Sequence, residues 1–338
     1  MKGSAAPSML RAVCVSPGRF TLAEAPRPME AAEGWVLVDI DTVGICGTDY
    51  HIFEGKHPFL EYPRVIGHEL AGRVAMEATG WKAGQPVVIN PYLSCGACRA
   101  CMRGRPNCCA DIAVLGVHVD GGMCDRIAVP ATNLYDATGL PEGAAALTEF
   151  LAIGAHAVRR AGPQAGDRVL ITGAGPIGLG VALFARLRGA EVHLRDTSMA
   201  RLEAMRAFGF GALHQVDAPL EAESFDIVFD ATGNRGAMEA GFGLVAHTGV
   251  YCLVGIVKDD LCFSDPDFHR REMTLMASRN ATAEDFHTVM AAFREGRIDA
   301  RTITSEVIDL TDMPARFPAL AADRDGIVKA VVQIGGAA

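Results

Sequence analysis

The sequence predicts an α/β protein in which a small β-barrel-like domain is joined to a doubly wound parallel sheet. Short apolar segments separated by Pro and Gly occupy residues 10–45, with Trp35–Ile40 as the clearest strand. An apolar strand later leads into a G-x-G-x-x-G turn at Gly173–Gly178. The chain has 338 residues, and single cores rarely grow beyond about 250–300 residues, so two domains are expected.

The composition indicates a globular enzyme and argues against several other classes. Hydrophobic residues make up 50% and charged residues 21% of the chain, unlike disordered or fibrous proteins. The net charge of −9 argues against a nucleic-acid surface and means that an anionic substrate must meet local positive charge. Met1–Ser8 is not followed by an apolar run, and no long uninterrupted apolar segment exists. We therefore expect a cytoplasmic protein with no membrane partner.

The first candidate metal site begins just after a predicted strand. Cys46 offers a thiolate, His68 an imidazole and Glu69 a carboxylate. Three such ligands with an open fourth position are typical of a catalytic zinc. Taken alone, a Cys is more often a small buried hydrophobe and a His more often a satisfied or solvated side chain. The order and context of these residues favour the metal site.

Three polar residues beside Cys46 supply the other groups that a catalytic zinc uses. Asp49 can hold the imidazole of His68, because a neighbouring carboxylate orients a metal-bound histidine. Thr48 can hydrogen-bond an alcohol at the zinc, and His51 can pass its proton to solvent. The segment thus predicts an alcohol-oxidising site.

Four closely spaced cysteines predict a second, structural zinc site. Their C-x2-C-x2-C-x7-C pattern lies in a loop with Gly and Pro, and four thiolates can close a tetrahedron around zinc. An iron–sulfur cluster is the alternative. The predicted ligands are Cys95, Cys98, Cys101 and Cys109, with Cys108 as a possible replacement for Cys109. We expect the ten cysteines to be metal-bound or free rather than a disulfide framework.

A single carboxylate, Glu149, lies in the apolar helical segment Ala144–Leu151. One interpretation is an acid at the helix N-terminus that the helix dipole stabilises. The other is a further zinc ligand delivered from the domain junction.

The second domain begins with the order of elements that binds a dinucleotide. A strand, the glycine turn, a helix at 179–188 and a second strand ending at Asp196 follow one another. Asp196 should bind the adenosine ribose 2′-hydroxyl and so favour NAD over NADP, although Arg195 and Arg201 lie close enough to weaken this preference. The residues expected to contact the cofactor are Gly173, Gly175, Pro176, Ile177, Gly178, Asp196, Arg201 and Val254.

Four more strands complete the expected six-stranded parallel sheet. They are His214–Val216, Phe225–Asp230, Val250–Gly255 and Met273–Ala277. The linker 217–224 is short for a crossover helix, so we expect a tight loop there. The strands at 304–310 and 326–334 are expected to rejoin the first domain.

These motifs resemble those of the zinc-dependent medium-chain dehydrogenases over nearly the whole chain. The matching segments, in family order, are Gly44–His51, Gly67–Glu69, the four-cysteine segment and Gly173–Gly178. The resemblance implies a GroES-like catalytic domain at 1–152 and 280–338, and a Rossmann NAD-binding domain at 153–279. It also implies a homodimer or homotetramer.

Within this family, the resemblance implies the polyol and sugar-acid branch. Glu149 stands where polyol dehydrogenases carry Glu and alcohol dehydrogenases carry a Cys ligand. The segments Val114–Gly122, Phe263–His269 and Ser278–Thr282 look most like bacterial L-galactonate and L-gulonate 5-dehydrogenases and related starvation-sensing proteins. A polyol or L-threonine dehydrogenase is the alternative, and a non-catalytic nucleotide-sensing regulatory protein is a more distant one.

The resemblance also implies roles for individual residues. Zinc lowers the pKa of a secondary alcohol, hydride passes to the nicotinamide, and Thr48 passes the hydroxyl proton through the cofactor ribose to His51. Arg279 and Asn280 lie at the mouth of the substrate pocket, where Arg279 either clamps a carboxylate or serves as a surface or cofactor-contacting residue. Lys329 stands where the family often has a basic residue near the pyrophosphate.

Overall fold

The structure is a computed structural model that describes residues 7–57, 60–78, 80–324 and 326–335. The chain divides into two compact units, Met1–Glu149 with Met290–Ala338, and Phe150–Val289. The domain boundaries given by the sequence stay a prediction. The expectation of no secretory signal rested in part on Met1–Ala6, and these residues lie outside the described part of the chain.

The first unit is built on a seven-stranded sheet centred on β3 (Trp35–Gly44). Val36, Leu37 and Val38 of β3 are all at most 1% exposed, so both faces of this strand are covered. The path of the sheet is β10-β6-β5-β3-β18-β17, and β9 also pairs with β3. The bounds are β5 (Glu69–Val74), β6 (Pro86–Ile89), β9 (Arg126–Pro130), β10 (Leu134–Asp136), β17 (Thr304–Asp309) and β18 (Lys329–Gln333).

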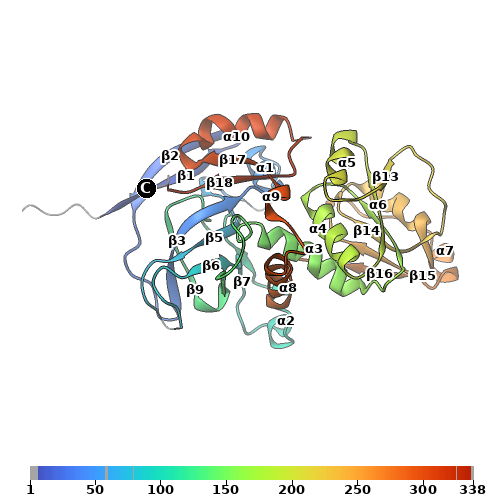
Figure 1. Ribbon diagram of the computed structural model, residues 1–338, viewed down its shortest axis with the longest axis horizontal. Coiled ribbons are helices and arrows are strands. Elements are labelled where there is room, and N and C mark those ends of the chain that lie inside the picture. The colour runs from blue at the N-terminus through green and yellow to red at the C-terminus, as the bar shows by residue number, and fades with distance from the viewer. Residues whose placement is uncertain (1–6, 58–59, 79, 325, 336–338) are drawn as a thin grey trace, which may run out of the picture. The chain divides into compact units, whose positions relative to one another are not determined.

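The C-terminal strands complete this sheet. In the antiparallel pair of β18 with β3, Val332 lies opposite Val43, so the prediction that the C-terminal segment rejoins the first domain is confirmed. Helix α10 (Met313–Ala322) contacts β2 and β17 (Figure 1). There Phe317 packs against Phe20 and Phe53, with ring centroids 4.8 and 5.2 Å away.

Smaller elements surround the sheet of the first unit. A three-stranded sheet contains β1 (Ser8–Ser16), β2 (Arg19–Pro26) and β4 (Arg64–Val65), and a two-stranded sheet contains β7 (Tyr92–Leu93) and β8 (Ala113–Val114). The short helices are α1 (Gly47–Phe53), α2 (Arg99–Met102) and α9 (Ala300–Ile303).

The second unit is a six-stranded, fully parallel sheet (Figure 1). The order β13-β12-β11-β14-β15-β16 is that of a doubly wound fold, which confirms the predicted fold class. Val169, Leu170 and Ile171 of β11 are fully buried, as expected for a strand covered on both faces. The bounds are β11 (Arg168–Thr172), β12 (Glu191–Asp196), β13 (Ala212–Gln215), β14 (Phe225–Asp230), β15 (Val245–Leu253) and β16 (Thr274–Ala277).

The connections of this sheet carry its helices. They are α4 (Pro176–Leu187), α5 (Met199–Arg206), α6 (Arg235–Gly241) and α7 (Asp265–Arg270), while α3 (Thr148–Ala161) and α8 (Ala283–Arg294) lie at the unit boundaries. Residues 217–224 contain no helix, so the prediction of a short loop there is confirmed.

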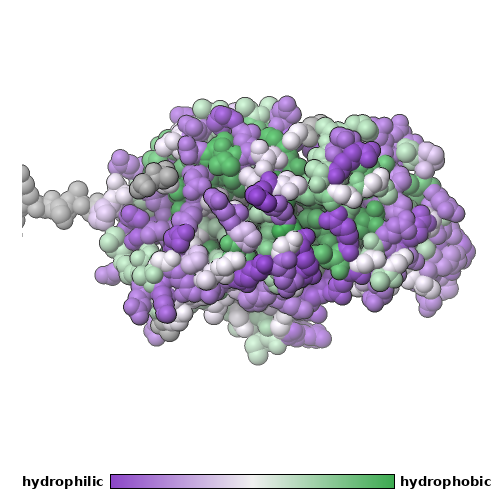
Figure 2. Space-filling model, viewed as in Figure 1, coloured by the Kyte–Doolittle hydropathy of each residue, from purple (hydrophilic) through white to green (hydrophobic). Residues whose placement is uncertain are grey.

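The surface of the molecule is largely polar on the face in view (Figure 2). Among the described residues, no helix combines the length and apolar character that a membrane crossing requires. The expected cellular location and oligomeric state stay predictions.

Candidate active site

Cys46, His68 and Glu69 form a compact group in the first unit. One potential ligand atom from each of them lies within 4.8 Å of the other two. Strand pairing produces this proximity, because β3 and β5 are antiparallel and Gly44 lies opposite Glu69. Cys46 follows β3 as the N-cap of α1. Two segments that are separate in the sequence therefore meet at one end of a strand pair.

Gly44 makes room for the carboxylate of Glu69. A Cβ atom on Gly44 would lie 2.0 Å from Oε2 of Glu69, far inside van der Waals contact. Both residues are buried. Any side chain at position 44 would displace this carboxylate from the group.

Asp49 connects the two segments that carry the group. Its Oδ2 accepts a hydrogen bond from the backbone N–H of Cys46 at 2.8 Å, and its Oδ1 accepts one from Gly67 at 3.3 Å. Oδ1 lies 3.8 Å from Nδ1 of His68, which is beyond hydrogen-bond distance. Asp49 thus fixes the backbone beside Cys46 and His68, and a direct orienting contact with the imidazole stays a prediction.

Thr48 and His51 lie on α1 at increasing exposure to solvent. The hydroxyl of Thr48 is 3.9 Å from the sulfur of Cys46, and this side chain is half-buried. His51 is exposed in the last turn of the helix. This arrangement suits the predicted proton path from a buried hydroxyl to solvent, and the path itself stays a prediction.

The donor set fits zinc. Buried polar atoms are usually hydrogen-bonded, yet Nδ1 of His68, Oε2 of Glu69 and Oε2 of Glu149 have no such partner among the described residues. Burial alone would lower the pKa of His68, but the neighbouring Cys46 and Asp49 raise it well above its ordinary value. The same negative surroundings would stabilise a divalent cation. A thiolate, an imidazole and a carboxylate are the usual ligands of a catalytic zinc.

Glu149 lies beside this group but is not part of it. It is buried in the first turn of α3, and the hydroxyl of Tyr92 donates a hydrogen bond to its Oε1. Burial raises the pKa of Glu149 to about 7, while His68 lowers this pKa and Glu69 raises it. The pKa of Glu149 thus responds to the charges of both predicted ligands. Whether Glu149 ligates zinc stays a prediction.

Two site residues were missed or misplaced by the sequence reasoning. Tyr92 gave no signal, since it belongs to none of the motifs. Lys329 was expected near the pyrophosphate, but its ammonium group lies 2.5 Å from Oε1 of Glu69 and 3.0 Å from the carbonyl of Ile45. It is 1% exposed, so it neutralises a buried carboxylate. A charged residue beside the apolar run Ala330–Val332 was the available signal.

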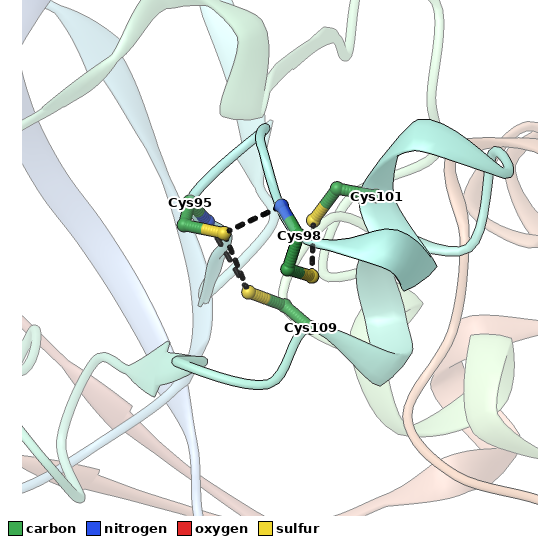
Figure 3. A group of neighbouring side chains, drawn as sticks. All are labelled: Cys95, Cys98, Cys101 and Cys109. Carbon is green, nitrogen blue, oxygen red and sulfur yellow. Dashed lines mark hydrogen bonds between the residues drawn. The ribbon is translucent and has the colours of Figure 1, made fainter.

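The four predicted cysteine ligands also come together (Figure 3). The sulfur atoms of Cys98 and Cys101 are 3.5 Å apart, and those of Cys95 and Cys109 are 3.4 Å apart. Backbone hydrogen bonds, the largest from Cys101, lower the pKa of Cys98 to about 6. A thiol that ionises readily suits a closed zinc site. Cys108 is exposed and lies outside the group.

In the second unit, the glycine turn after β11 fits a bound pyrophosphate. A Cβ on Gly178 would lie 1.8 Å from the carbonyl oxygen of Gly173, whereas Gly175 faces open space. Helix α4 begins at Pro176 and its N-cap, Gly175, offers no capping side chain. The N-terminal N–H groups of this helix can therefore bind an anion.

Other predicted cofactor residues lie at the same carboxyl edge of the sheet. Asp196 ends β12 and accepts hydrogen bonds from the N–H groups of Ala174 at 2.7 Å and Ser198 at 2.8 Å. Arg201 is in the first turn of α5, and Val254 directly follows β15. Ligands of open α/β sheets bind at this edge.

Arg279 and Asn280 follow β16 and reach this edge from the last strand. Arg279 is exposed, and Asn280 is half-buried with a φ of +52°. Their predicted contact with substrate stays a prediction.

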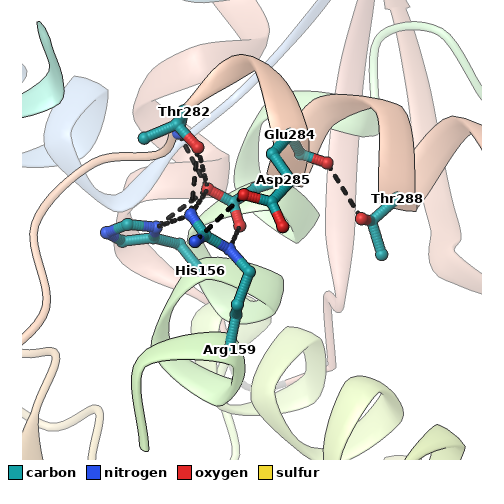
Figure 4. Close-up of polar contacts among 6 residues, drawn as sticks. All are labelled: His156, Arg159, Thr282, Glu284, Asp285 and Thr288. Atoms are coloured by element: carbon teal, nitrogen blue, oxygen red, sulfur yellow. Dashed lines mark hydrogen bonds and ion pairs between the residues drawn. The ribbon is translucent and has the colours of Figure 1, made fainter. Parts of the chain in front are cut away.

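A buried polar network holds the chain just after these two residues (Figure 4). Asp285 accepts hydrogen bonds from Thr282 and Arg159 at 2.7 Å each, and its Oδ2 lies 2.8 Å from Nδ1 of His156. Burial alone would raise the pKa of Asp285, but the bonds from His156 and Arg159 hold it well below its ordinary value. The network fixes where α8 begins.

Comparisons with known proteins agree with these arrangements. The alcohol dehydrogenase GroES-like domain family matches residues 32–141, and the zinc-binding dehydrogenase family matches residues 176–295. L-galactonate-5-dehydrogenase of Escherichia coli K12 is 43% identical over 307 residues, which is 85% of this chain and 88% of that protein.

Two solved structures from Escherichia coli share the whole fold with a TM-score of 0.89 each. One is described as a short chain alcohol dehydrogenase, RspB of strain CFT073, complexed with NADH; it is 26% identical and covers 96% of this chain and 99% of its own. The other is L-idonate 5-dehydrogenase, which is 27% identical and covers 97% and 98%. The chain therefore belongs to the zinc-dependent medium-chain dehydrogenases and is an oxidoreductase.

Proposed function

We propose that the chain oxidises a secondary alcohol of a sugar acid, of the L-gulonate or L-galactonate type, with NAD as the hydride acceptor. The observation that carries this proposal is the Cys46–His68–Glu69 group with Thr48 beside it. The names of L-galactonate-5-dehydrogenase and L-idonate 5-dehydrogenase support the substrate class, and the NADH complex of the RspB structure supports the cofactor.

Cys46, His68 and Glu69 would hold zinc, and the glycine turn and Asp196 would hold NAD. When bound, zinc supplies Lewis-acid stabilisation of negative charge on the substrate oxygen, and NAD accepts the hydride. The reaction converts the secondary alcohol and NAD⁺ to a ketone, NADH and one proton. Thr48 accepts the hydroxyl proton, and the exposed His51 passes it to solvent. Asp49 keeps the backbone of Cys46 and Gly67 in place.

Arg279 is the residue that we assign to the substrate carboxylate. A guanidinium group can bind a carboxylate through two parallel hydrogen bonds, and the formal net charge of −9 makes such a local cation necessary for an anionic substrate. A neutral substrate would need no such residue.

The test is NADH formation, followed by absorbance, with zinc-loaded protein and a panel of L-gulonate, L-galactonate, other aldonates, sorbitol and L-threonine. We expect turnover of aldonates and its loss after chelation of zinc. Turnover confined to sorbitol or L-threonine would favour a polyol or threonine dehydrogenase instead. Silence across the panel would contradict the proposed function.

The Arg279→Ala variant tests the carboxylate contact. A charge-assisted hydrogen bond contributes about 1.5–3 kcal/mol, so KM for an aldonate should rise roughly 10- to 100-fold. KM for sorbitol should be almost unchanged. Arg206→Ala, an exposed arginine of α5 paired with Glu203, is the matched control. Equal effects of Arg279→Ala on both substrates would exclude the clamp.

A further inference from the structure

Helix α3 contacts two parts of the second unit through opposite faces. One face carries Gly154, where an added Cβ would lie 2.4 Å from the carbonyl carbon of Gly180 in α4. The other face carries His156 and Arg159, which bond Asp285 in the first turn of α8 (Figure 4). An α-helix turns about 100° per residue, so Gly154 and His156 point about 200° apart. Helix α3 therefore has fixed contacts with both α4 and the start of α8.

The contact with α8 is a dense set of hydrogen bonds around one carboxylate. Asp285 is 1% exposed and accepts a hydrogen bond from Nε of Arg159 at 2.7 Å. It also accepts bonds from the backbone N–H of Thr282 at 2.8 Å and from the hydroxyl of Thr282 at 2.7 Å. Nη2 of Arg159 donates to the same hydroxyl at 3.0 Å. Thr282 is thereby fixed to α3 as well as to α8.

Thr282 ends a short segment that follows β16. At its start, the N–H of Ser278 donates to the carbonyl of Leu253, the last residue of β15, at 2.8 Å. Residues 279–281 lie between these two anchors, and Asn280 has a φ of +52°. A left-handed residue other than glycine persists where its surroundings hold it in place. The sheet therefore fixes one end of the segment 278–282, and α3 fixes the other.

This segment borders the half of the cofactor crevice that lies away from the adenosine. The strand order β13-β12-β11-β14-β15-β16 reverses direction between β11 and β14, and a dinucleotide spans an α/β sheet at such a point. Asp196 at the end of β12 is the residue proposed above for the adenosine ribose. The nicotinamide would then lie on the side of β14, β15 and β16, where the segment begins.

We propose that Arg159, Asp285 and Thr282 are positioning residues for the nicotinamide end of the cofactor. Through them, α3 holds the segment after β16 in a fixed position relative to α4, whose first turn is the proposed pyrophosphate site. The three residues act through this segment and need no contact of their own with the cofactor. Binding of the adenosine half, at Asp196 and the glycine turn, does not depend on them.

This inference rests on the proposed function for the identity of the cofactor, but its test needs no substrate. The probes are NADH and ADP-ribose, which has the adenosine and pyrophosphate of NADH but lacks the nicotinamide. Calorimetric titration of the zinc-loaded protein gives the Kd of each. A general loss of order in the second unit would weaken the binding of both, whereas displacement of the segment 278–282 would weaken that of NADH alone.

Two variants loosen the contact between α3 and this segment. Arg159→Met removes the bonds of the guanidinium group to Asp285 and Thr282, and Thr282→Val removes the hydroxyl that Arg159 and Asp285 share. We expect each to raise the Kd for NADH roughly 2- to 30-fold, the range for residues that act on a ligand without touching it. The Kd for ADP-ribose should be almost unchanged. The milder Thr282→Val carries the test if Arg159→Met does not fold.

Thr282→Ser keeps the hydroxyl and should bind both probes as the parent does. Two matched controls should do the same. Arg160→Met changes the exposed neighbour of Arg159 in α3. Thr288→Val removes an exposed hydroxyl of α8 that bonds the carbonyl of Glu284 at 2.9 Å (Figure 4).

Unchanged NADH binding in Thr282→Val would overturn the inference, and so would an equal weakening of NADH and ADP-ribose. Failure of the proposed function would appear differently. The variants would then weaken NADH selectively, while the parent turned over no substrate in the panel.

Discussion

The two cysteine-containing groups of this protein differ in how the chain assembles them. The four-cysteine group comes from residues 95–109, and its sulfur atoms contact one another and nearby backbone N–H groups. The Cys46–His68–Glu69 group is formed by strand pairing, and the chain adds Asp49 and Lys329 around it. One group is local and partly exposed, whereas the other is buried and surrounded by charge.

This difference indicates what each group can do. A closed set of four thiolates satisfies zinc completely and leaves no position for substrate. The Cys46 group has three ligands and further carboxylates nearby, so its charge must be balanced by the chain. We therefore expect loss of the four-cysteine site to affect local order, and loss of the Cys46 site to affect chemistry. The following changes test this distinction, beginning with the largest effect.

His68→Ala should reduce kcat/KM by about 10³-fold or more. The Lewis-acid contribution of a metal is several kcal/mol, and each 1.4 kcal/mol corresponds to a factor of ten. Metal analysis should show loss of one zinc and retention of the other. His269→Ala, at an exposed position of α7, is the control and should behave as the parent. Full activity in His68→Ala would remove the basis for calling this group catalytic.

Lys329→Met should lower the free energy of unfolding of the metal-free protein by about 3–5 kcal/mol, because it leaves the buried Glu69 charge without its partner. The loss should be smaller in the zinc-loaded protein, where the metal supplies positive charge. Denaturant titration measures both states. The double variant Lys329→Met, Glu69→Gln should recover most of the stability. An equal loss with and without zinc would show that metal and Lys329 do not share this carboxylate.

Asp285→Asn should lower stability at neutral pH by about 2–3 kcal/mol, because Asp285 is 1% exposed and bonded to His156 and Arg159. The pKa of Asp285 lies well below its ordinary value of 3.8. Its stabilising contribution is therefore complete above about pH 4 and is lost as the pH falls below that value. The difference between parent and variant should shrink on acidification.

Denaturant titrations across this pH range measure the Asp285 effect. The control is Asp299→Asn, whose carboxylate pairs with Arg301 at the surface and should contribute little. This pair of variants compares a buried carboxylate with an exposed one, and neither carboxylate belongs to a cysteine-containing group. A stability difference that grows toward low pH would contradict the assigned direction of the pKa shift.

Cys98→Ser should increase tryptic cleavage within residues 99–105 by about tenfold or more, since losing about 1.4 kcal/mol of local stability raises the open population tenfold. The exposed Arg99 and Arg103 provide the cleavage sites. Turnover by uncleaved protein should remain close to that of the parent. Cys108→Ser is the control, because Cys108 is a neighbour outside the group. Equal sensitivity of both variants would argue against Cys109 as the fourth ligand.

Much of the fold could be predicted because the patterns are local. The run from β11 to Asp196 contains strand, glycine turn, helix and strand in sequence, and this order alone specifies a parallel pair with a right-handed crossover. The four-cysteine metal site could likewise be predicted, because a short loop can bring closely spaced thiols together. Cys46, His68 and Glu69 were identified from residue type and from the family resemblance, since their meeting depends on the pairing of β3 with β5.

The sequence by itself determined the fold class, the four-cysteine group and the dinucleotide turn, because each depends on short-range spacing or on a periodic apolar pattern. Only the tertiary structure decided the surroundings of the carboxylates. Lys329 reaches Glu69 because β18 returns to pair with β3, and Tyr92 reaches Glu149 across 57 positions of the chain. Such contacts arise from long-range strand pairing and burial. They join residues that are far apart in the chain, so no local spacing rule in the sequence predicts them.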